Sequence, residues 1–348
     1  MSAVDQKTDA ILDDDLSLIA RWAQAAGQER FVAQEISGGK SGSRVYKVNL
    51  GNAKEVVVKF NTTAAELSVA RQLGDHLVFG TARTPKGAVD ALLPGAIIYE
   101  VVQGPTLTEL KAAGVDGLAR IAAKAIADFS AGFAREVREP LPSRDIIVEK
   151  FRNPLGPHGL WLRSQAAQGQ EVAQRALGAL ETNVAGSRIL ASQNDMHGGN
   201  LLLAPDGTVS IIDFGAASMV PENMLVAKLL LQFEREYGSN SSRILASELR
   251  HVGFEINAPK VEDAAALVLA WRASSNGTEI DPQALDSLRQ SLMDHPSMLD
   301  RDTPLTTLTL DLRGFQSTEE QGLASTREKL RQRSIPRSVA SSLSIPKI

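Results

Sequence analysis

The sequence contains no cysteine, which excludes disulfide frameworks, thiolate nucleophiles and cysteine-based zinc or iron–sulfur sites. Histidine is also scarce, and its five copies are scattered, so we expect no histidine-rich metal cluster. Basic residues do not dominate, because the formal net charge is −4, and a nucleic-acid partner is not expected. The rest of the composition, 43% hydrophobic and 22% charged over 348 residues, is that of a globular protein with room for two lobes.

Long hydrophobic runs are missing as well. The longest runs, such as AAALVLAW at 264–271, are far shorter than the roughly 18–20 residues that a membrane-spanning helix needs. The N-terminal stretch is polar and acidic, where a secretory signal is basic and then apolar. We therefore expect a cytoplasmic protein without a membrane partner.

The first hundred residues are rich in strand patterns. A leading helix is expected where Leu16, Ile19 and Ala23 recur at helical spacing, with residues 13–15, all aspartate, near its positive start. β-Branched runs separated by glycine turns then predict antiparallel strands with one inserted helix. The strands are expected at 31–36, 44–50, 55–60, 84–92 and 96–102, and the helix at 64–74.

The chain changes character after Thr108 and becomes mainly helical. Long helical patterns occupy 118–137 and 172–184, and four more follow between Glu222 and Met298. Short strands are expected only at 188–195 and 208–214. These patterns predict an α+β fold with a sheet-containing small lobe at 1–103, a helical lobe at 104–311 and a basic, partly flexible tail at 312–348.

The strings QNDMHGGNLLL at 193–203 and SIIDFG at 210–215 carry the strongest chemical signal. Asp195 and Asn200 are separated by a short glycine-rich loop, so both side chains can point to one side, and Asp213 leaves the end of an apolar strand. Phosphoryl transfer needs a carboxylate to take or orient the proton of the acceptor hydroxyl, and oxygen ligands for magnesium. We assign Asp195 to the first role and Asn200 and Asp213 to the metal.

Upstream residues supply the partners that nucleotide phosphates need. Lys59 lies on an otherwise apolar strand, and Glu66 on the next helix could hold its ammonium group against the phosphates. Each has a simpler explanation, as an edge lysine or an ordinary surface glutamate. The loop at 37–43 offers small residues that let the backbone approach phosphates, namely Gly39, Ser41, Gly42 and Ser43.

The string GGKS at 38–41 is not a P-loop. A Walker A motif requires glycine where this chain has Gln34, and it is followed by a helix, whereas the residues after Ser43 have a strand pattern.

In their order along the chain, these motifs resemble the protein-kinase-like phosphotransferases, and within them the aminoglycoside phosphotransferase and choline kinase group. The resemblance covers about residues 30–240. The catalytic-loop pattern H-G-D-x4-N or H-N-D-x4-N of that group is matched from Gln193 to Asn200, and its D-F-G from Asp213 to Gly215. The resemblance implies a two-lobed protein-kinase-like fold, the cofactors ATP and Mg²⁺, and Lys59 as the phosphate-binding lysine.

The same resemblance places adenine contacts at the hinge between the lobes. It assigns them to the carbonyl of Glu100 and the amide of Val102, just after Tyr99. Gln193 departs from the pattern, because the family usually has a histidine there that braces the loop. Neither Met224 nor Leu225 is the aspartate that members acting on small molecules often carry.

The acceptor is expected to be the hydroxyl group of a small molecule, because a helical pattern follows Asp213 too soon for a peptide-binding segment. Residues 221–311 hold 14 acidic against 8 basic residues, which would favour a cationic acceptor such as an aminoglycoside or amino alcohol. The basic tail could bind an acidic partner or stay solvated. Trp161 and Trp271 could line a cleft, although core positions are commoner.

Two alternatives remain open: a nucleotide-binding regulatory module of the same fold, favoured by Gln193, and an atypical protein kinase. The second would need an irregular insert near 140–165 to replace the usual peptide platform.

Overall fold

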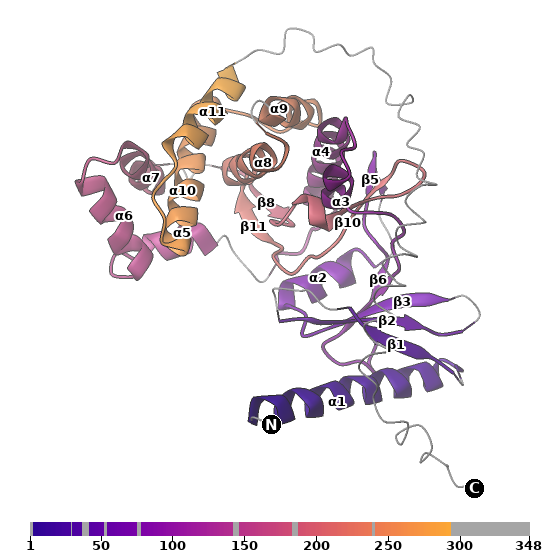
Figure 1. The fold of residues 1–348 in the computed structure, drawn as a ribbon. Coiled ribbons are helices and arrows are strands. Elements are labelled where there is room, and N and C mark those ends of the chain that lie inside the picture. Colours follow the sequence, from indigo (N-terminus) through magenta and orange to yellow (C-terminus); the bar gives the residue numbers. More distant parts are fainter. Residues whose placement is uncertain are drawn as a thin grey trace, which may run out of the picture. The chain divides into compact units, whose positions relative to one another are not determined.

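The computed structural model describes residues 3–28, 30–36, 42–51, 54–74, 78–141, 146–182, 187–238 and 241–293. All of them belong to one unit of the fold, residues 1–297 (Figure 1). The predicted tail at 312–348 lies outside the described residues, and the predicted boundaries after residues 103 and 311 stay predictions. No helix within the described ranges is both long enough and apolar enough to cross a bilayer.

The predicted strands of the first hundred residues form one antiparallel sheet. In spatial order they are β1 (Val32–Glu35), β2 (Arg44–Asn49), β3 (Glu55–Phe60), β7 (Ile97–Glu100) and β6 (Gly87–Ala88). Side chains alternate between the two faces of such a sheet. Val58 is therefore buried on one face, while its neighbour Lys59 points to the other.

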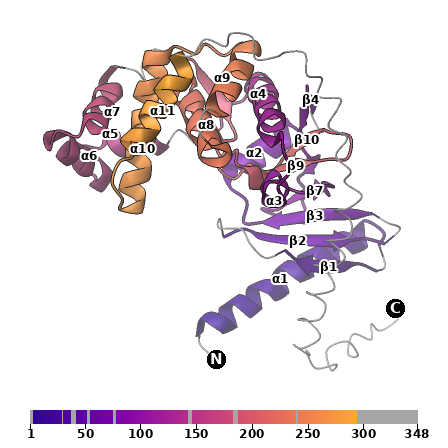
Figure 2. The ribbon, with the colours of Figure 1, turned by 45° about the horizontal axis from the view of Figure 1, so that its top comes forward.

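Helix α1 (Ala3–Ala25) covers the first of these faces, on the side of the sheet away from the helical lobe (Figures 1 and 2). Ile19 and Ala23, two residues of the predicted spacing, are buried there together with Trp22 and Tyr46, whereas Leu16 is 38% exposed. The aspartates at 13–15 do not cap this helix, because it begins ten residues before them. Asp15 is instead buried and accepts hydrogen bonds from Arg44 Nη2 (2.7 Å) and the Tyr46 hydroxyl (3.2 Å).

Helix α2 (Ala64–Gln72) packs on the sheet through its contacts with β6. Its first turn is capped by Thr63, whose hydroxyl accepts a hydrogen bond from the Glu66 amide at 3.1 Å. The helix ends within two residues of the predicted position.

A second sheet joins chain segments from before and after the hinge. Its order is β4 (Val78–Phe79), β5 (Ala82–Arg83), β10 (Val209–Ile211) and β9 (Leu201–Leu203), with β5 parallel to β10. The sequence did not predict β4, β5 or β9 as strands. The predicted strand at 188–195 is the shorter β8 (Ile189–Ser192), which pairs with β11 (Ser218–Pro221) and not with β10.

Helices dominate the rest of the chain, as predicted. They are α3 (Leu107–Ala112), α4 (Leu118–Glu136), α5 (Ile146–Arg152), α6 (Pro157–Ala167), α7 (Glu171–Thr182), α8 (Glu222–Tyr237), α9 (Ser241–His251), α10 (Ala258–Asn276) and α11 (Pro282–Met293). The apolar run at 264–271 is the middle of α10, which is buried on most sides because it packs against both α7 and α8. The described residues of 140–165 belong mostly to α5 and α6 and do not form the irregular insert that a peptide platform would need.

Candidate active site

Lys59, Glu66 and Asp213 converge from three different elements. Lys59 Nζ donates to Glu66 Oε1 at 2.9 Å and to Asp213 Oδ1 at 2.7 Å. Lys59 and Glu66 are buried, whereas the Asp213 side chain is 39% exposed. The alternation of β3 and the first turn of α2 thus bring these three predicted residues together. Asp213 lies 154 positions after Lys59 in the sequence.

These contacts shift the protonation equilibria of the cluster. Burial disfavours the ammonium of Lys59, but Glu66 and Asp213 outweigh it and raise the pKa of the lysine. Burial raises the pKa of Glu66 against the effect of Lys59, and no described residue donates to its Oε2. Burial also opposes ionisation of Asp213, but the hydrogen bond and charge of Lys59 prevail and lower the pKa of that carboxyl. The ionised form of Asp213 is the one that could bind a cation.

Tyr99 is a member of the cluster that sequence reasoning missed. Its hydroxyl donates to Glu66 Oε1 at 3.3 Å, and burial followed by the nearby Glu66 raises its pKa well above the ordinary value. The alternation of β7 places Tyr99 on the face that carries Lys59, since Tyr99 is opposite Val57, two residues before Lys59, in the register. That register is a property of the paired strands and is not visible in the sequence.

Gln193 connects the two loops of the site. Its side-chain nitrogen donates to the carbonyls of Ile212 (3.2 Å) and Asp213 (2.6 Å), and its side-chain oxygen accepts from the Asp195 amide at 2.7 Å. The residue is fully buried. Glutamine at this position therefore braces the loop, as the resemblance expects of a histidine.

Asp195 and Asn200 lie together across the turn, which is closed by a single 3-10 turn, η1 (Gly198–Asn200). Asn200 Nδ2 donates to the Asp195 carbonyl at 2.9 Å and lies 3.5 Å from Asp195 Oδ2. His197 Nε2 is 3.6 Å from the same carboxylate oxygen. The Asp195 side chain is 53% exposed, so it is accessible to a ligand.

The oxygen atoms present fit a magnesium ion that takes its other ligands from elsewhere. No residue in the described ranges donates to the Asn200 amide oxygen, while Asp213 is ionised and partly exposed. The described residues contain no group of three or more acidic, histidine or cysteine side chains that could enclose a metal by themselves. Magnesium commonly binds through one or two protein ligands together with phosphates and water.

The residues predicted to bind the nucleotide lie in the glycine-rich loop and at the hinge. Gly39 and Ser41 lie outside the described residues; Gly42 has a positive φ of 70°, and the Ser43 hydroxyl donates to the Asn61 carbonyl at 3.4 Å. At the hinge, Glu100 ends β7 and Val102 follows it. No residue in the described ranges accepts a hydrogen bond from the Val102 amide, which leaves it open to a ligand.

Gly104 sets how closely the hinge approaches the second sheet. Its φ is 121°, and a Cβ atom at this position would lie 2.1 Å from the Leu203 carbonyl oxygen. Only glycine allows this backbone conformation and this contact without a shift.

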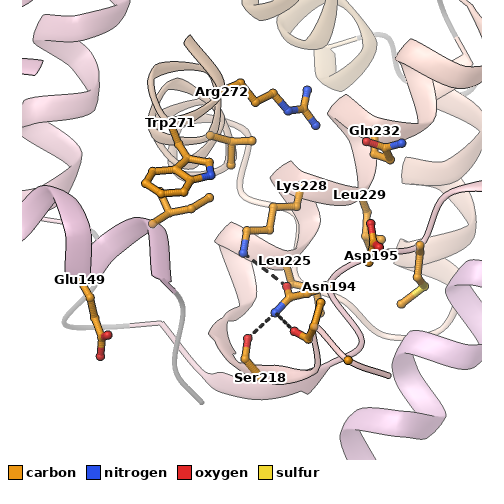
Figure 3. Close-up of a pocket in the computed structure, with 15 residues that line it drawn as sticks. Glu149, Asn194, Asp195, Ser218, Leu225, Lys228, Leu229, Gln232, Trp271 and Arg272 are labelled. Carbon is orange, nitrogen blue, oxygen red and sulfur yellow. Dashed lines mark hydrogen bonds between the residues drawn. The ribbon is translucent and has the colours of Figure 1, made fainter. Parts of the chain in front are cut away.

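A cavity of about 920 Å³ opens beside Asp195 (Figure 3). It lies among α5, α8, α10 and the loops that follow β8 and β10. Its lining includes Glu149, Asn194, Asp195, Leu225, Lys228, Leu229, Gln232, Val268, Trp271 and Arg272. Of the two tryptophans considered from the sequence, Trp271 lines the cavity, and Trp161 is not part of the lining.

Sequence reasoning missed most of this lining, although a signal was present. On α8, the lining residues from Leu225 to Gln232 follow the spacing i, i+3, i+4, i+7, and on α10 those from Val268 to Arg272 follow i, i+3, i+4. Lys228 and Arg272 are the cations on these two helical faces. A cation on such a face indicates a cavity only when the helices packed around it are known, and the sequence does not show them.

The family profile of the phosphotransferase enzyme family matches residues 32–239. This range is more than half of the chain, so the chain belongs to that family. The prediction of a phosphotransferase that acts on a hydroxyl group is thereby confirmed. None of the curated protein sequences matches the chain closely enough to count as a relative.

The chain is also similar to several solved structures. The aminoglycoside phosphotransferase APH(4)-Ia has 12% identity and a TM-score of 0.53, over 80% of this chain and 98% of the other. A thermostable mutant of it, in a ternary complex with AMP-PNP and hygromycin B, has 14% identity and a TM-score of 0.52, over 75% and 93%. Choline kinase LicA from Streptococcus pneumoniae has 15% identity and a TM-score of 0.48, over 82% and 98%. The likeness to the aminoglycoside phosphotransferase confirms the predicted two-lobed α+β fold.

Proposed function

We propose that the protein transfers the γ-phosphoryl group of ATP to a hydroxyl group of a small molecule. The observation that carries the proposal is the convergence of Lys59 and Asp213, 2.7 Å apart, close to the loop that presents Asp195 to a large cavity. A similar fold binds AMP-PNP and hygromycin B together in the aminoglycoside phosphotransferase, which supports a site for a nucleotide and a small acceptor.

In this proposal the small lobe holds the nucleotide. Lys59, kept in place by Glu66, binds the phosphates, and the Glu100 carbonyl and Val102 amide bind the adenine ring. The backbone of the glycine-rich loop covers the phosphates through Gly39, Ser41, Gly42 and Ser43.

Asn200 and Asp213 would hold magnesium through their side-chain oxygens. When bound, Mg²⁺ neutralises charge on the phosphates and orients them. The hydrogen bond from Asn200 Nδ2 to the Asp195 carbonyl supports this role, because it directs the amide oxygen away from the loop.

Asp195 acts as the base. Its carboxylate accepts the proton of the acceptor hydroxyl as that oxygen bonds to the γ-phosphorus, and the bond from this phosphorus to the β-phosphate oxygen breaks to release ADP. The carboxylate is exposed toward the cavity, where an acceptor could reach it.

A small acceptor is supported over a peptide by the chain after Asp213. Helix α8 begins at Glu222, and the intervening residues include β11, which is paired with β8. The regulatory-module alternative was favoured by Gln193, but the three hydrogen bonds of this residue support a braced and functional loop.

The test uses the purified protein with Mg²⁺, γ-labelled ATP and a cell extract. Label is expected in the small-molecule fraction. Asp195→Asn should abolish this transfer, because the amide cannot take the proton, while ATP affinity stays close to that of the wild type. The matched control is Asp206→Asn, which changes an exposed aspartate in the turn before β10 and should leave transfer intact. Full transfer by Asp195→Asn, or label found only in protein, contradicts the proposal.

A further inference from the structure

The carboxylate of Glu236 joins the catalytic loop to the wall of the cavity. Glu236 lies in the last turn of α8, and its Oε2 accepts a hydrogen bond from the Gly198 amide at 2.9 Å. Its Oε1 accepts one from Gln232 Nε2 at 2.6 Å. Gln232 is one of the residues that line the cavity (Figure 3), whereas Gly198 lies between Asp195 and Asn200 in the sequence. One side chain thus contacts both parts of the proposed site.

Helical spacing places Glu236 next to the cavity. It follows Gln232 by four residues, so both side chains lie on the face of α8 that also carries the lining residues Leu225 and Leu229. Gln232 is held at its other end as well, because its Oε1 accepts a hydrogen bond from Arg235 Nη2 at 2.7 Å. The orientation of this cavity-lining amide is therefore fixed by two neighbours on its own helix.

The Gly198 amide differs from its neighbours in the loop, because it donates to another element. The Asn200 amide donates to the His197 carbonyl at 2.8 Å, and the Gly199 amide donates to His197 Nδ1 at 3.1 Å. The His197 amide donates to the Asp195 carbonyl at 3.0 Å. These bonds shape the loop from within. The bond from Gly198 to α8 instead fixes it from outside, at a point between the proposed base and the proposed magnesium ligand.

The turn has no room for a side chain at residue 198. A Cβ atom there would lie 2.9 Å from Thr108 Oγ1 on α3 and 3.6 Å from Glu236 Oε2 on α8. Helix α3 also contacts the end of α8, because Lys111 Nζ donates to the Glu236 carbonyl. The turn is therefore packed closely against both helices, and glycine lets the amide meet the carboxylate without a clash.

The contact between Glu236 and Gly198 belongs to a strong class of hydrogen bond. Those to an ionised carboxylate are about twice as strong as those between neutral groups. Within the described ranges this carboxylate forms no ion pair that would compete for its oxygens, in contrast to Glu262, which pairs with Arg175 and Arg289. Gly198 is buried, so removal of the carboxylate would leave its amide without an acceptor.

We propose that Glu236 is a positioning residue of the phosphotransfer reaction, which holds the catalytic loop through Gly198 and links it to Gln232 in the cavity wall. This inference rests on the proposed function, since it concerns the loop that carries Asp195 and Asn200 in that reaction. Glu236 is not among the groups that would bind ATP or take the proton, so it acts by keeping those two side chains in place. A misplacement of about 1 Å can lower a catalytic rate roughly a hundredfold.

The first test measures activity. Each full-length variant is incubated with Mg²⁺, saturating γ-labelled ATP and the small-molecule fraction of a cell extract, and ATP affinity is measured by calorimetric titration. Glu236→Ala should lower the initial rate of label transfer roughly tenfold or more, with ATP affinity within about twofold of the wild type. The matched control is Glu234→Ala, which removes a carboxylate of the same helix that contacts Ser242 (2.9 Å) and Ser287, and it should spare the rate in the folded protein. Equal rates of the two variants, or a loss that weaker ATP binding explains, overturn the inference.

Conservative variants separate position from charge. Glu236→Gln keeps the length of the side chain and one acceptor oxygen for the Gly198 amide, so it should restore part of the rate that the alanine variant loses. Glu236→Asp keeps the charge but is one methylene shorter, so it should restore less. This order is expected whether or not Glu236→Ala folds. An aspartate variant at least as active as the glutamine variant assigns the effect to charge and overturns the inference.

Amide hydrogen exchange tests the loop without any acceptor. Residues 196–200 should exchange faster in Glu236→Ala, or in Glu236→Asp, than in the wild type and in Glu234→Ala. Unchanged exchange overturns the inference. Wild-type protein that transfers no label contradicts the proposed function instead, and the exchange measurement then still tests the contact with Gly198. Normal transfer by Glu236→Ala beside an active wild type contradicts the inference alone.

Discussion

The side chain of Gln193 donates a hydrogen bond to the main-chain carbonyl of Asp213 at 2.6 Å, and its oxygen accepts from the amide of Asp195 at 2.7 Å. One neutral side chain thus fixes the spacing of two carboxylates on different loops. An amide cannot be protonated in the physiological range, so this brace keeps its hydrogen bonds at pH values where a histidine would gain charge.

Removal of this brace should lower both activity and stability. Gln193→Ala leaves partly buried backbone groups unpaired, so we expect the free energy of unfolding to fall by about 1–3 kcal/mol and kcat to fall more than ATP affinity. Denaturant unfolding and steady-state kinetics measure the two effects. The control is Gln72→Ala, which removes a similar two-way contact with the Glu139 backbone far from the cavity and should spare kcat in the folded protein. Equal effects of both variants on kcat would refute a positioning role for Gln193.

The stabilisation from the ion pair of Lys59 and Asp213 should decrease at acid pH. Because the folded state lowers the pKa of Asp213, the stabilisation from this carboxylate is present above its ordinary value of 3.8 and is lost as the pH falls through the folded-state value. A double-mutant cycle with Lys59→Met and Asp213→Asn should give a coupling of about 1 kcal/mol at neutral pH, since Asp213 is partly exposed. The coupling should decline below pH 3.8.

Unfolding by denaturant across the acid range measures this coupling. The cycle of Lys47 and Glu55 is the matched comparison, because this 3.0 Å pair has a more exposed cation and should couple more weakly. A Lys59–Asp213 coupling that stays constant below pH 3.8 is incompatible with the assigned ion pair.

The hinge should not tolerate a side chain at residue 104. Gly104→Ala places a methyl group against the Leu203 carbonyl at a positive φ, so we expect the free energy of unfolding to drop by about 2–4 kcal/mol. The control is Gly178→Ala in α7, where a Cβ atom meets nothing within 4 Å and alanine should be neutral or stabilise by up to about 1 kcal/mol. Thermal and denaturant unfolding compare the two, and equal effects would contradict the close approach.

Local patterns predicted the elements well where short-range physics determines them. The β-branched run around Val58 predicted β3, and the spacing around Ile19 predicted a leading helix. The patterns also predicted the candidate cluster, because Lys59, Glu66 and Asp213 belong to motifs with a fixed order. The predicted start of α1 was wrong, since the polar residues before Leu16 give no apolar pattern to show that the helix already begins at Ala3.

The features that could not be predicted from the sequence depend on pairing between distant segments. The two-residue strands β4 and β5 are too short for a periodic signal and exist because β10 is beside them. The bracing role of Gln193 depends on two loops that meet only in the folded chain. For the same reason, the cavity wall formed by α8 and α10 could not be assembled from either helix alone.

The parallel pairing of β5 with β10 also constrains how the chain folds. Ala82 pairs with Phe79 on one side, but its partner on the other side is Val209, whose amide donates to the Thr81 carbonyl at 2.9 Å. During synthesis the N-terminal end is made first, so this edge of β5 must wait without its β10 partner until α3 to α7 have also been made. A nascent chain truncated before Val209 should therefore be a better client for chaperones than the complete protein.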